Sequence, residues 1–137
     1  MKQLRPTSAH VDLRQLQANL KLVRDAIPPQ TMILAAVKGD AYGHGAVQCA
    51  QALTEAGVDW FGVALVEEGR TLRQHGIKTP ILCMGGTGPM GAPEAVKHDL
   101  TPLISSVDEA RLLNLDKRLA ERKDMTGSVS AMQLVRL

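Results

Sequence analysis

Residues 31–45, TMILAAVKGDAYGHG, predict the fold more clearly than any other stretch of the chain. The first seven residues form an almost unbroken apolar run, which is typical of a strand buried on both faces of a parallel sheet. Lys38 follows this run directly, and three glycines follow Lys38 within seven residues. We therefore expect a buried strand that ends at a lysine and continues into a tight, glycine-containing turn.

Similar apolar runs recur along the chain, and amphipathic helical patterns separate them. The apolar runs predict further strands at residues 60–65, 80–84 and 100–104. Helices are predicted at residues 13–26, 45–56, 66–75, 93–98 and 107–121. Strands that alternate with helices indicate an α/β fold with a parallel sheet, whose strands all end at the same edge. Because a complete (β/α)8 barrel takes roughly 250 residues, about four βα units predict a partial TIM barrel.

The composition excludes several classes of protein. Of the 137 residues, 45% are hydrophobic, which is too many for a disordered chain. The net charge of +2 is too small to indicate nucleic acid or an anionic membrane as a partner. No apolar run approaches the roughly 20 residues of a membrane span, and no secretory signal is visible. With two cysteines and four scattered histidines, we expect a soluble, cytoplasmic protein without a metal site.

The predicted domain organisation has two parts. Residues 1–121 are expected to form the partial barrel, and residues 122–137 a divergent or frayed C-terminal tail. Two interpretations stay open for the sequence AMQLV at 131–135, a final strand or a frayed end. Half a barrel exposes sheet edges and apolar strand faces, so we expect poor solubility or self-association that covers them.

Lys38 and Tyr42 are the candidates for chemistry. An apolar environment disfavours the charged form of an amine, and the neutral amine is a nucleophile toward aldehydes. The hydroxyl of Tyr42, the only tyrosine of the chain, could bind a phosphate or a ring substituent. The simpler interpretation is a lysine whose stem packs on apolar surface beside an ordinary glycine-rich turn. Taken alone, the residue types favour the simpler interpretation.

The wider sequence favours the chemical interpretation. The segment AAVKGDAYGHG at 35–45 closely resembles the pyridoxal-phosphate attachment motif of the alanine racemase family, A-V-V-K-A-[DN]-A-Y-G-H-G. Gly39 departs from the motif, where the family usually has alanine. The segments AHVDLRQLQANLKLVR, VDWFGVALVEEGRTLRQHGIKTPILCMGG and LTPLISSVDEARLL are also similar to the family's opening blocks. The resemblance covers about residues 8–119.

The resemblance implies a pyridoxal 5'-phosphate-dependent amino-acid racemase that interconverts L- and D-alanine, with the D-alanine used in cell-wall synthesis. It implies an N-terminal (β/α)8 barrel, a second β-rich domain and a homodimer. Lys38 matches the catalytic lysine that binds the cofactor as a Schiff base and then exchanges a proton with the substrate. Tyr42 matches the tyrosine that contacts the cofactor phosphate, and Met84 corresponds less securely to a residue lining the cofactor.

Racemisation needs two acid/base groups on opposite faces of the α-carbon. In the family, the second group is a tyrosine from the partner subunit, but Tyr42 lies too near Lys38 in sequence to reach the opposite face. Residues 123–127, KDMTG, echo the family's next motif only loosely. A non-catalytic remnant and a cofactor-binding scaffold are therefore kept as alternatives. The small single-domain pyridoxal-phosphate barrel family is a weaker one, because the loop matches the racemase motif.

Four weaker signals have simple interpretations. Residues 86–91 spell G-x-G-x-x-G, but two prolines predict that the next helix begins only after the third glycine, which favours a loop over a dinucleotide site. His44 either steadies the Lys38 turn by a hydrogen bond or faces solvent. Cys49 and Cys83 are expected to be small buried hydrophobic residues. Glu67 and Glu68 open a helix, where acidic side chains interact favourably with the helix dipole.

Overall fold

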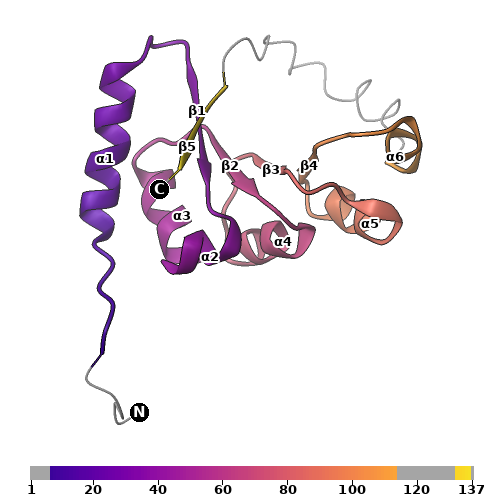
Figure 1. Cartoon of the computed structure of the whole chain (residues 1–137), viewed down its shortest axis with the longest axis horizontal. Coiled ribbons are helices and arrows are strands. Elements are labelled where there is room, and N and C mark those ends of the chain that lie inside the picture. The colour runs from indigo at the N-terminus through magenta and orange to yellow at the C-terminus, as the bar shows by residue number, and fades with distance from the viewer. Residues whose placement is uncertain (1–6, 114–131, 137) are drawn as a thin grey trace.

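The computed structural model describes residues 7–113 and 132–136, and within them helices and strands alternate as predicted (Figure 1). The strands are β1 (Met32–Ala36), β2 (Trp60–Val63), β3 (Ile81–Cys83), β4 (Thr101–Pro102) and β5 (Met132–Arg136). The longer helices are α1 (Leu13–Ala26), α3 (Ala46–Glu55), α4 (Val66–Gln74) and α5 (Gly88–Lys97). Two short elements, α2 (Lys38–Gly43) and α6 (Val107–Leu112), complete the set.

All five strands are parallel, in the order β4-β3-β2-β1-β5. The register pairs Ala36 with Gly62 and Val63 with Cys83. The first four strands therefore end at one common edge, and the loops that follow them meet there. The structure confirms the predicted α/β fold, a partial TIM barrel of parallel βα units.

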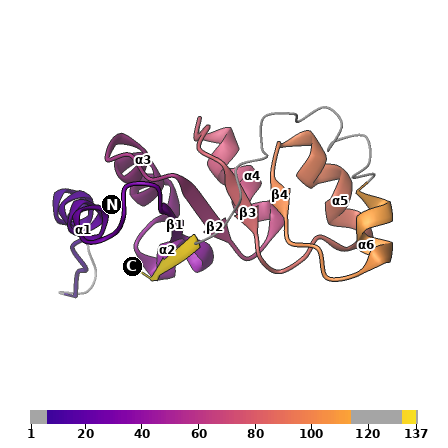
Figure 2. The ribbon, with the colours of Figure 1, turned by 90° about the horizontal axis from the view of Figure 1, so that it is seen from above.

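Helices α3 and α4 cover one face of the sheet, and α1 lies beside α3 at one end of the molecule (Figure 2). Ile33, Ala35 and Val37 pack on this covered side with Leu53 of α3 and Leu72 of α4, all fully buried. The opposite face carries Leu34, Gly62 and Met84, and it would point inward in a complete barrel. A Cβ on Gly62 would lie 2.7 Å from Leu34 Cδ2, so a larger residue there would have to displace this buried side chain.

Arginine side chains satisfy backbone carbonyls at the opposite, amino-terminal edge of the sheet. Arg24 of α1 donates to the Thr31 carbonyl at 2.8 Å and forms an ion pair with Asp59. Arg73 of α4 donates to the carbonyls of Ile77 and Thr79 at 2.7 and 2.8 Å. These carbonyls lie in the loops that lead into β1 and β3, so the two arginines stabilise the edge of the sheet that does not carry Lys38.

Some element boundaries differ from the predictions. Helix α5 begins at Gly88, five positions before the predicted start at 93. Pro89 permits this early start because proline is tolerated in the first turn, and the helix then continues through Pro93. Strand β4 has two residues, not the five predicted at 100–104. The predicted continuation of α6 to residue 121 lies outside the described residues.

The C-terminal segment resolves one alternative left open by the sequence. Residues Met132–Arg136 form β5, which pairs in parallel with β1, so this part is a strand and not a frayed end. The predicted domain boundary between residues 121 and 122 lies outside the described residues. Across the ranges that the structure describes, no helix is long and apolar enough to cross a membrane.

Candidate functional site

Lys38 lies at the edge of the sheet where the first four strands end. It follows β1 by two residues and is half-buried. Val37, just before it, donates to the Gly62 carbonyl of β2 at 2.8 Å, which fixes the strand end next to its neighbour. Within residues 7–113, no hydrogen bond or ion pair engages the amine of Lys38. The amine therefore lies beside a buried strand and has no hydrogen-bond or ion-pair partner among the residues that the structure describes.

The residues after Lys38 form a left-handed turn. Gly39, Asp40, Ala41 and Tyr42 have φ values of 60°, 53°, 53° and 56°. Left-handed backbone costs a non-glycine residue about 1–2 kcal/mol, and three such residues follow one another here. Strain of this kind persists only where surrounding contacts fix it, and it concentrates at functional sites. Gly39 suits the first position, because glycine adopts positive φ without this cost.

Hydrogen bonds within the turn fix its shape. The Ala41 amide donates to the Val37 carbonyl at 2.9 Å, and Ala41 itself is buried. Asp40 Oδ1 accepts from the Ala46 amide at 2.7 Å, so the turn also satisfies the first residue of α3. His44 donates through Nδ1 to the Ala41 carbonyl at 2.8 Å and is otherwise exposed. Both interpretations offered for His44 therefore hold at once.

The carboxylate of Glu68 ties this turn to the neighbouring βα loop. Its Oε1 accepts from the Gly39 amide at 2.7 Å. Its Oε2 accepts from the amides of Ala64 and Leu65, at 2.7 and 3.0 Å, in the loop after β2. The sequence predicts only acidic residues that open a helix here, because Glu67 and Glu68 in a first turn carry no signal of a contact with a distant loop.

Glu109 makes an equivalent link between the next two loops. Its Oε1 accepts from the Thr87 amide at 2.9 Å, and its Oε2 accepts from the Ser105 amide at 3.0 Å. The side chain is buried, and the hydrogen bonds from Ser105 and Thr87 lower the pKa of this carboxyl below its usual value.

This carboxylate also bears on the G-x-G-x-x-G sequence. The expected late helix start was wrong, since α5 runs through Gly91. The Glu109 carboxylate nevertheless occupies the Thr87 amide, so its negative charge stands where a dinucleotide would need to bring a pyrophosphate. The structure therefore gives a different reason for the same conclusion, that this loop does not suit a dinucleotide.

Tyr42 and Met84 lie at the same edge of the sheet. Tyr42 is half-buried and belongs to the same short element as Lys38. Met84 follows β3, and its amide donates to the Val63 carbonyl at 2.9 Å. Its side chain reaches toward β2, since a Cβ on Gly62 would lie 3.2 Å from Met84 Cε. The structure thus brings the predicted residues to one edge, and their roles stay predictions.

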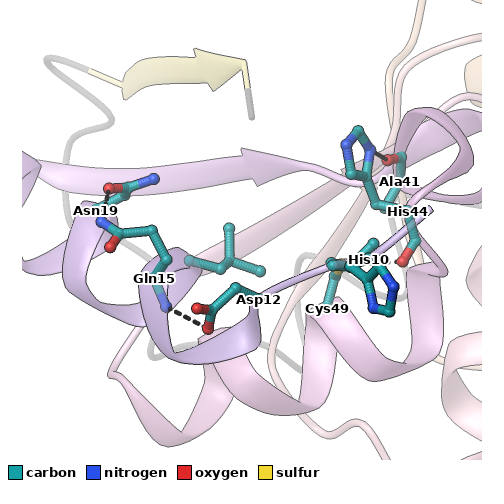
Figure 3. Close-up of a pocket in the computed structure, with 9 residues that line it drawn as sticks. His10, Asp12, Gln15, Asn19, Ala41, His44 and Cys49 are labelled. Carbon is teal, nitrogen blue, oxygen red and sulfur yellow. Dashed lines mark hydrogen bonds between the residues drawn. The ribbon is translucent and has the colours of Figure 1, made fainter.

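A cavity of about 270 Å³ lies on the helix side of the turn, between the start of α1 and α3 (Figure 3). The residues labelled around it include His10, Asp12, His44 and Cys49, and Lys38 does not line it. In the part of the chain that the structure describes, no three His, Cys, Asp or Glu side chains gather closely enough to hold a metal ion.

Both thiols are buried, which confirms the interpretation of the cysteines as small hydrophobic residues. Burial, and then the Asp40 carboxylate, raises the pKa of Cys49. Burial, together with nearby charges of which Glu68 is the largest contributor, raises the pKa of Cys83 to about 11. Neither cysteine is therefore a reactive thiolate at neutral pH.

Known proteins resemble this chain in sequence and in structure. Residues 11–125 match the family model described as alanine racemase, N-terminal domain. The alanine racemase of Symbiobacterium thermophilum is 52% identical over 115 residues, which cover 84% of this chain and 30% of that protein. Alanine racemase 1 of Caldanaerobacter subterraneus subsp. tengcongensis is 44% identical over 110 residues, 80% of this chain and 28% of that protein.

A solved alanine racemase of Clostridium difficile 630 superposes with a TM-score of 0.78 at 36% identity, covering 87% of this chain and 32% of that one. The chain thus spans less than a third of the length of these curated relatives. The matched residues include the strand, the turn and the loops described above. On this sequence and structural similarity, the chain belongs to the alanine racemase family and corresponds to part of its N-terminal barrel domain.

Proposed function

We propose that this chain serves pyridoxal 5'-phosphate-dependent racemisation of alanine, with Lys38 as the residue that binds the cofactor covalently. One observation carries the proposal: the Lys38 amine, engaged by no described residue, stands at the carboxyl edge of the sheet on a strained left-handed turn. Catalytic groups of parallel barrels lie at this edge. Membership of the alanine racemase family supports the choice of reaction.

The residues at this edge fit the cofactor. Lys38 offers a primary amine for its aldehyde, and Tyr42 on the same turn offers a hydroxyl for its phosphate. Gly62 carries no side chain, and the ends of the Leu34 and Met84 side chains pack over it, so apolar groups form the neighbouring sheet surface. When bound, pyridoxal phosphate supplies a conjugated ring that stores the electron pair left on the α-carbon after its proton is removed.

Lys38 also has a proton to move. In its free, neutral form the amine accepts the proton of the α-carbon from the face that it borders, and in its charged form it returns a proton to that face. The left-handed turn limits the positions that the amine can take, because Gly39, directly after Lys38, is hydrogen-bonded to Glu68. Proton transfer requires this kind of fixed approach.

The proton on the opposite face needs a second group. Tyr42 is the only tyrosine of the chain and shares the turn with Lys38, so it serves the same face. We therefore assign the second acid/base group to a polypeptide segment outside this chain. Full racemisation of alanine then belongs to an assembly that includes such a segment.

Exposed apolar side chains near the same edge give that association a surface. Met90 of α5 is 92% exposed and Val107 of α6 is 67% exposed, and Leu65 and Leu103 in the neighbouring loops are also exposed. Leu65 and Met90 line one hollow of the surface, and exposed apolar surface of this kind favours association. Self-association through this edge is thus part of the proposal, and the cytoplasmic location expected from the sequence stays a prediction.

A cofactor-binding scaffold without racemase activity is the second candidate. The single tyrosine favours it. An acid/base group on one face can exchange the proton of the α-carbon with solvent, but it cannot invert the configuration of that carbon. The two candidates agree on Lys38 and differ in the fate of the α-proton.

Solvent deuterium exchange separates the candidates. The chain, with pyridoxal phosphate and L-alanine in deuterated water, should introduce deuterium at the α-carbon faster than free pyridoxal phosphate does, and the Lys38→Ala variant should not. The formation of D-alanine, measured by chiral chromatography, shows whether a second acid/base group acts on the opposite face. Deuterium in L-alanine without D-alanine indicates one working face. Exchange by Lys38→Ala at the rate of the unmodified chain would contradict the proposal.

A further inference from the structure

We propose that Glu68 is a positioning residue that holds the Lys38 turn in its left-handed form and in register with the end of β2. The importance of Lys38 rests on the proposed function. The link itself rests on the hydrogen bonds of this carboxylate, which joins two loops that are distant in sequence.

Each of the two carboxylate oxygens of Glu68 accepts hydrogen bonds from a different loop. Oε1 takes the Gly39 amide at 2.7 Å, directly after Lys38, and Oε2 takes the Ala64 and Leu65 amides at the start of α4. All three groups are donors, so the position requires acceptors on both sides. A glutamine there would keep its single oxygen on the Ala64 and Leu65 amides, two contacts against one, and would turn its NH2 group toward Gly39 and lose that contact.

The location of the Gly39 contact matters for the turn. Gly39 is the first of five consecutive residues with positive φ, at the point where the chain leaves β1. Gly39 is exposed, so without the carboxylate its amide would bond to water, which does not hold the turn, and the three strained non-glycine residues would then favour ordinary backbone conformations. Glu68 thereby opposes a relaxation that would swing Lys38 away from the sheet edge.

The chain contains the same device a second time. Residues 66–70 read VEEGR and residues 107–111 read VDEAR, so Glu68 and Glu109 hold equivalent places in a repeated five-residue pattern. Glu109 joins the Thr87 and Ser105 amides just as Glu68 joins Gly39 to Ala64. Glu109, however, links two loops that do not contain Lys38. The molecule therefore provides a matched control for the role of Glu68.

The positioning role and a purely structural role make different predictions. Acidic residues in the first turn of a helix stabilise that helix wherever they occur. If Glu68 acted only in this way, Glu68→Gln and Glu109→Gln would each lower stability, and neither would affect Lys38 in particular. If Glu68 positions the turn, the two variants differ at Gly39 and at Lys38.

Amide hydrogen exchange on the full chain tests the link without any cofactor. Glu68→Gln should speed exchange at Gly39 roughly tenfold or more and leave Thr87 unchanged, because one hydrogen bond to a charged acceptor is lost. Glu109→Gln should speed exchange at Thr87 and leave exchange at Gly39 unchanged. Unchanged exchange at Gly39 in Glu68→Gln would overturn the link.

Covalent labelling tests the consequence for Lys38. The rate at which pyridoxal phosphate and borohydride label Lys38 should fall about tenfold in Glu68→Gln and stay unchanged in Glu109→Gln. Glu68→Asp keeps the charge at the helix start but is too short to reach Gly39. Its labelling rate should therefore fall as much as that of Glu68→Gln. Labelling that falls equally in Glu68→Gln and Glu109→Gln would reduce Glu68 to a structural residue. If Lys38 of the unmodified chain is not labelled, the proposed function fails, while the exchange at Gly39 still decides the link.

Discussion

The amide of Gly39 donates a 2.7 Å hydrogen bond to the carboxylate of Glu68, although the two residues lie 29 positions apart in the chain. Gly39 adjoins the candidate cofactor lysine, and Glu68 belongs to the helix after the next strand. The position of Lys38 therefore depends on β2 and α4 as well as on its own strand. This dependence makes the turn a property of the assembled sheet and not of the local sequence.

Asp40→Ala should lower the free energy of unfolding by about 1 kcal/mol, the usual cost of removing an acceptor for a helix N-terminal amide. Asp40 Oδ1 accepts from the Ala46 amide at 2.7 Å, and alanine leaves that amide without its partner. Asp40→Asn keeps the oxygen and tolerates positive φ, so its loss should be smaller. Urea unfolding measures both variants, and equal losses would contradict the assigned hydrogen bond.

Gly85→Ala should destabilise the chain by about 1–3 kcal/mol, because overpacking against backbone cannot relax easily. A Cβ at Gly85 would lie 2.5 Å from the Ala64 carbonyl oxygen, which would force the loops after β2 and β3 apart.

Gly69→Ala is the matched control for this packing. Its Cβ would lie 2.9 Å from Leu100 Cδ1, the end of a side chain that can move. Alanine also gains up to about 1 kcal/mol over glycine inside a helix. The midpoint of thermal unfolding should therefore be higher for Gly69→Ala than for Gly85→Ala. A lower midpoint for Gly69→Ala would contradict the packing described at this edge.

Glu109 should make stability depend on acid pH. Hydrogen bonds from Ser105 and Thr87 lower the pKa of its carboxyl in the folded state. A group with a lowered folded pKa contributes stability above the unfolded value of about 4.3, and this contribution is lost as pH falls through the folded pKa. Glu109→Gln should therefore lose less stability on acidification than the unmodified chain. Parallel curves of unfolding free energy against pH would contradict this assignment.

Tyr42→Phe should weaken the binding of pyridoxal phosphate about tenfold or more, since a hydrogen bond to a charged phosphate would be lost. The covalent link at Lys38 should persist, because the hydroxyl takes no part in it. Titration followed by the absorbance of the bound cofactor gives the dissociation constant. A constant equal to that of the unmodified chain would exclude the phosphate contact.

Most of the fold could be predicted because its signals are local. Helix α1 begins and ends where the sequence predicts, since Asp12 accepts from the Arg14 and Gln15 amides and two prolines follow the helix. The apolar runs predict four strands for a similar local reason. Each strand of a parallel sheet is buried on both faces and therefore consists mostly of apolar residues. The early start of α5 was missed because Pro93 was interpreted as a first-turn residue, whereas Pro89 takes that place.

The candidate site could be predicted only in part. Lys38 and Tyr42 are visible in a motif, but the left-handed conformation of Asp40, Ala41 and Tyr42 opposes their local preferences and depends on contacts elsewhere. Glu68 and Glu109 were missed as links between loops, because acidic residues commonly open helices for reasons of charge alone. The repeated pattern VEEGR and VDEAR was the signal that could have identified them.

The role of Lys38 is tested by trapping pyridoxal phosphate on the chain with borohydride and locating the pyridoxyl group by peptide mass spectrometry. We expect a pyridoxyl group on Lys38 in the unmodified chain, its loss in Lys38→Ala, and its retention when the exposed Lys78 is replaced by alanine. Labelling spread evenly over the surface lysines, or unchanged in Lys38→Ala, would contradict this role.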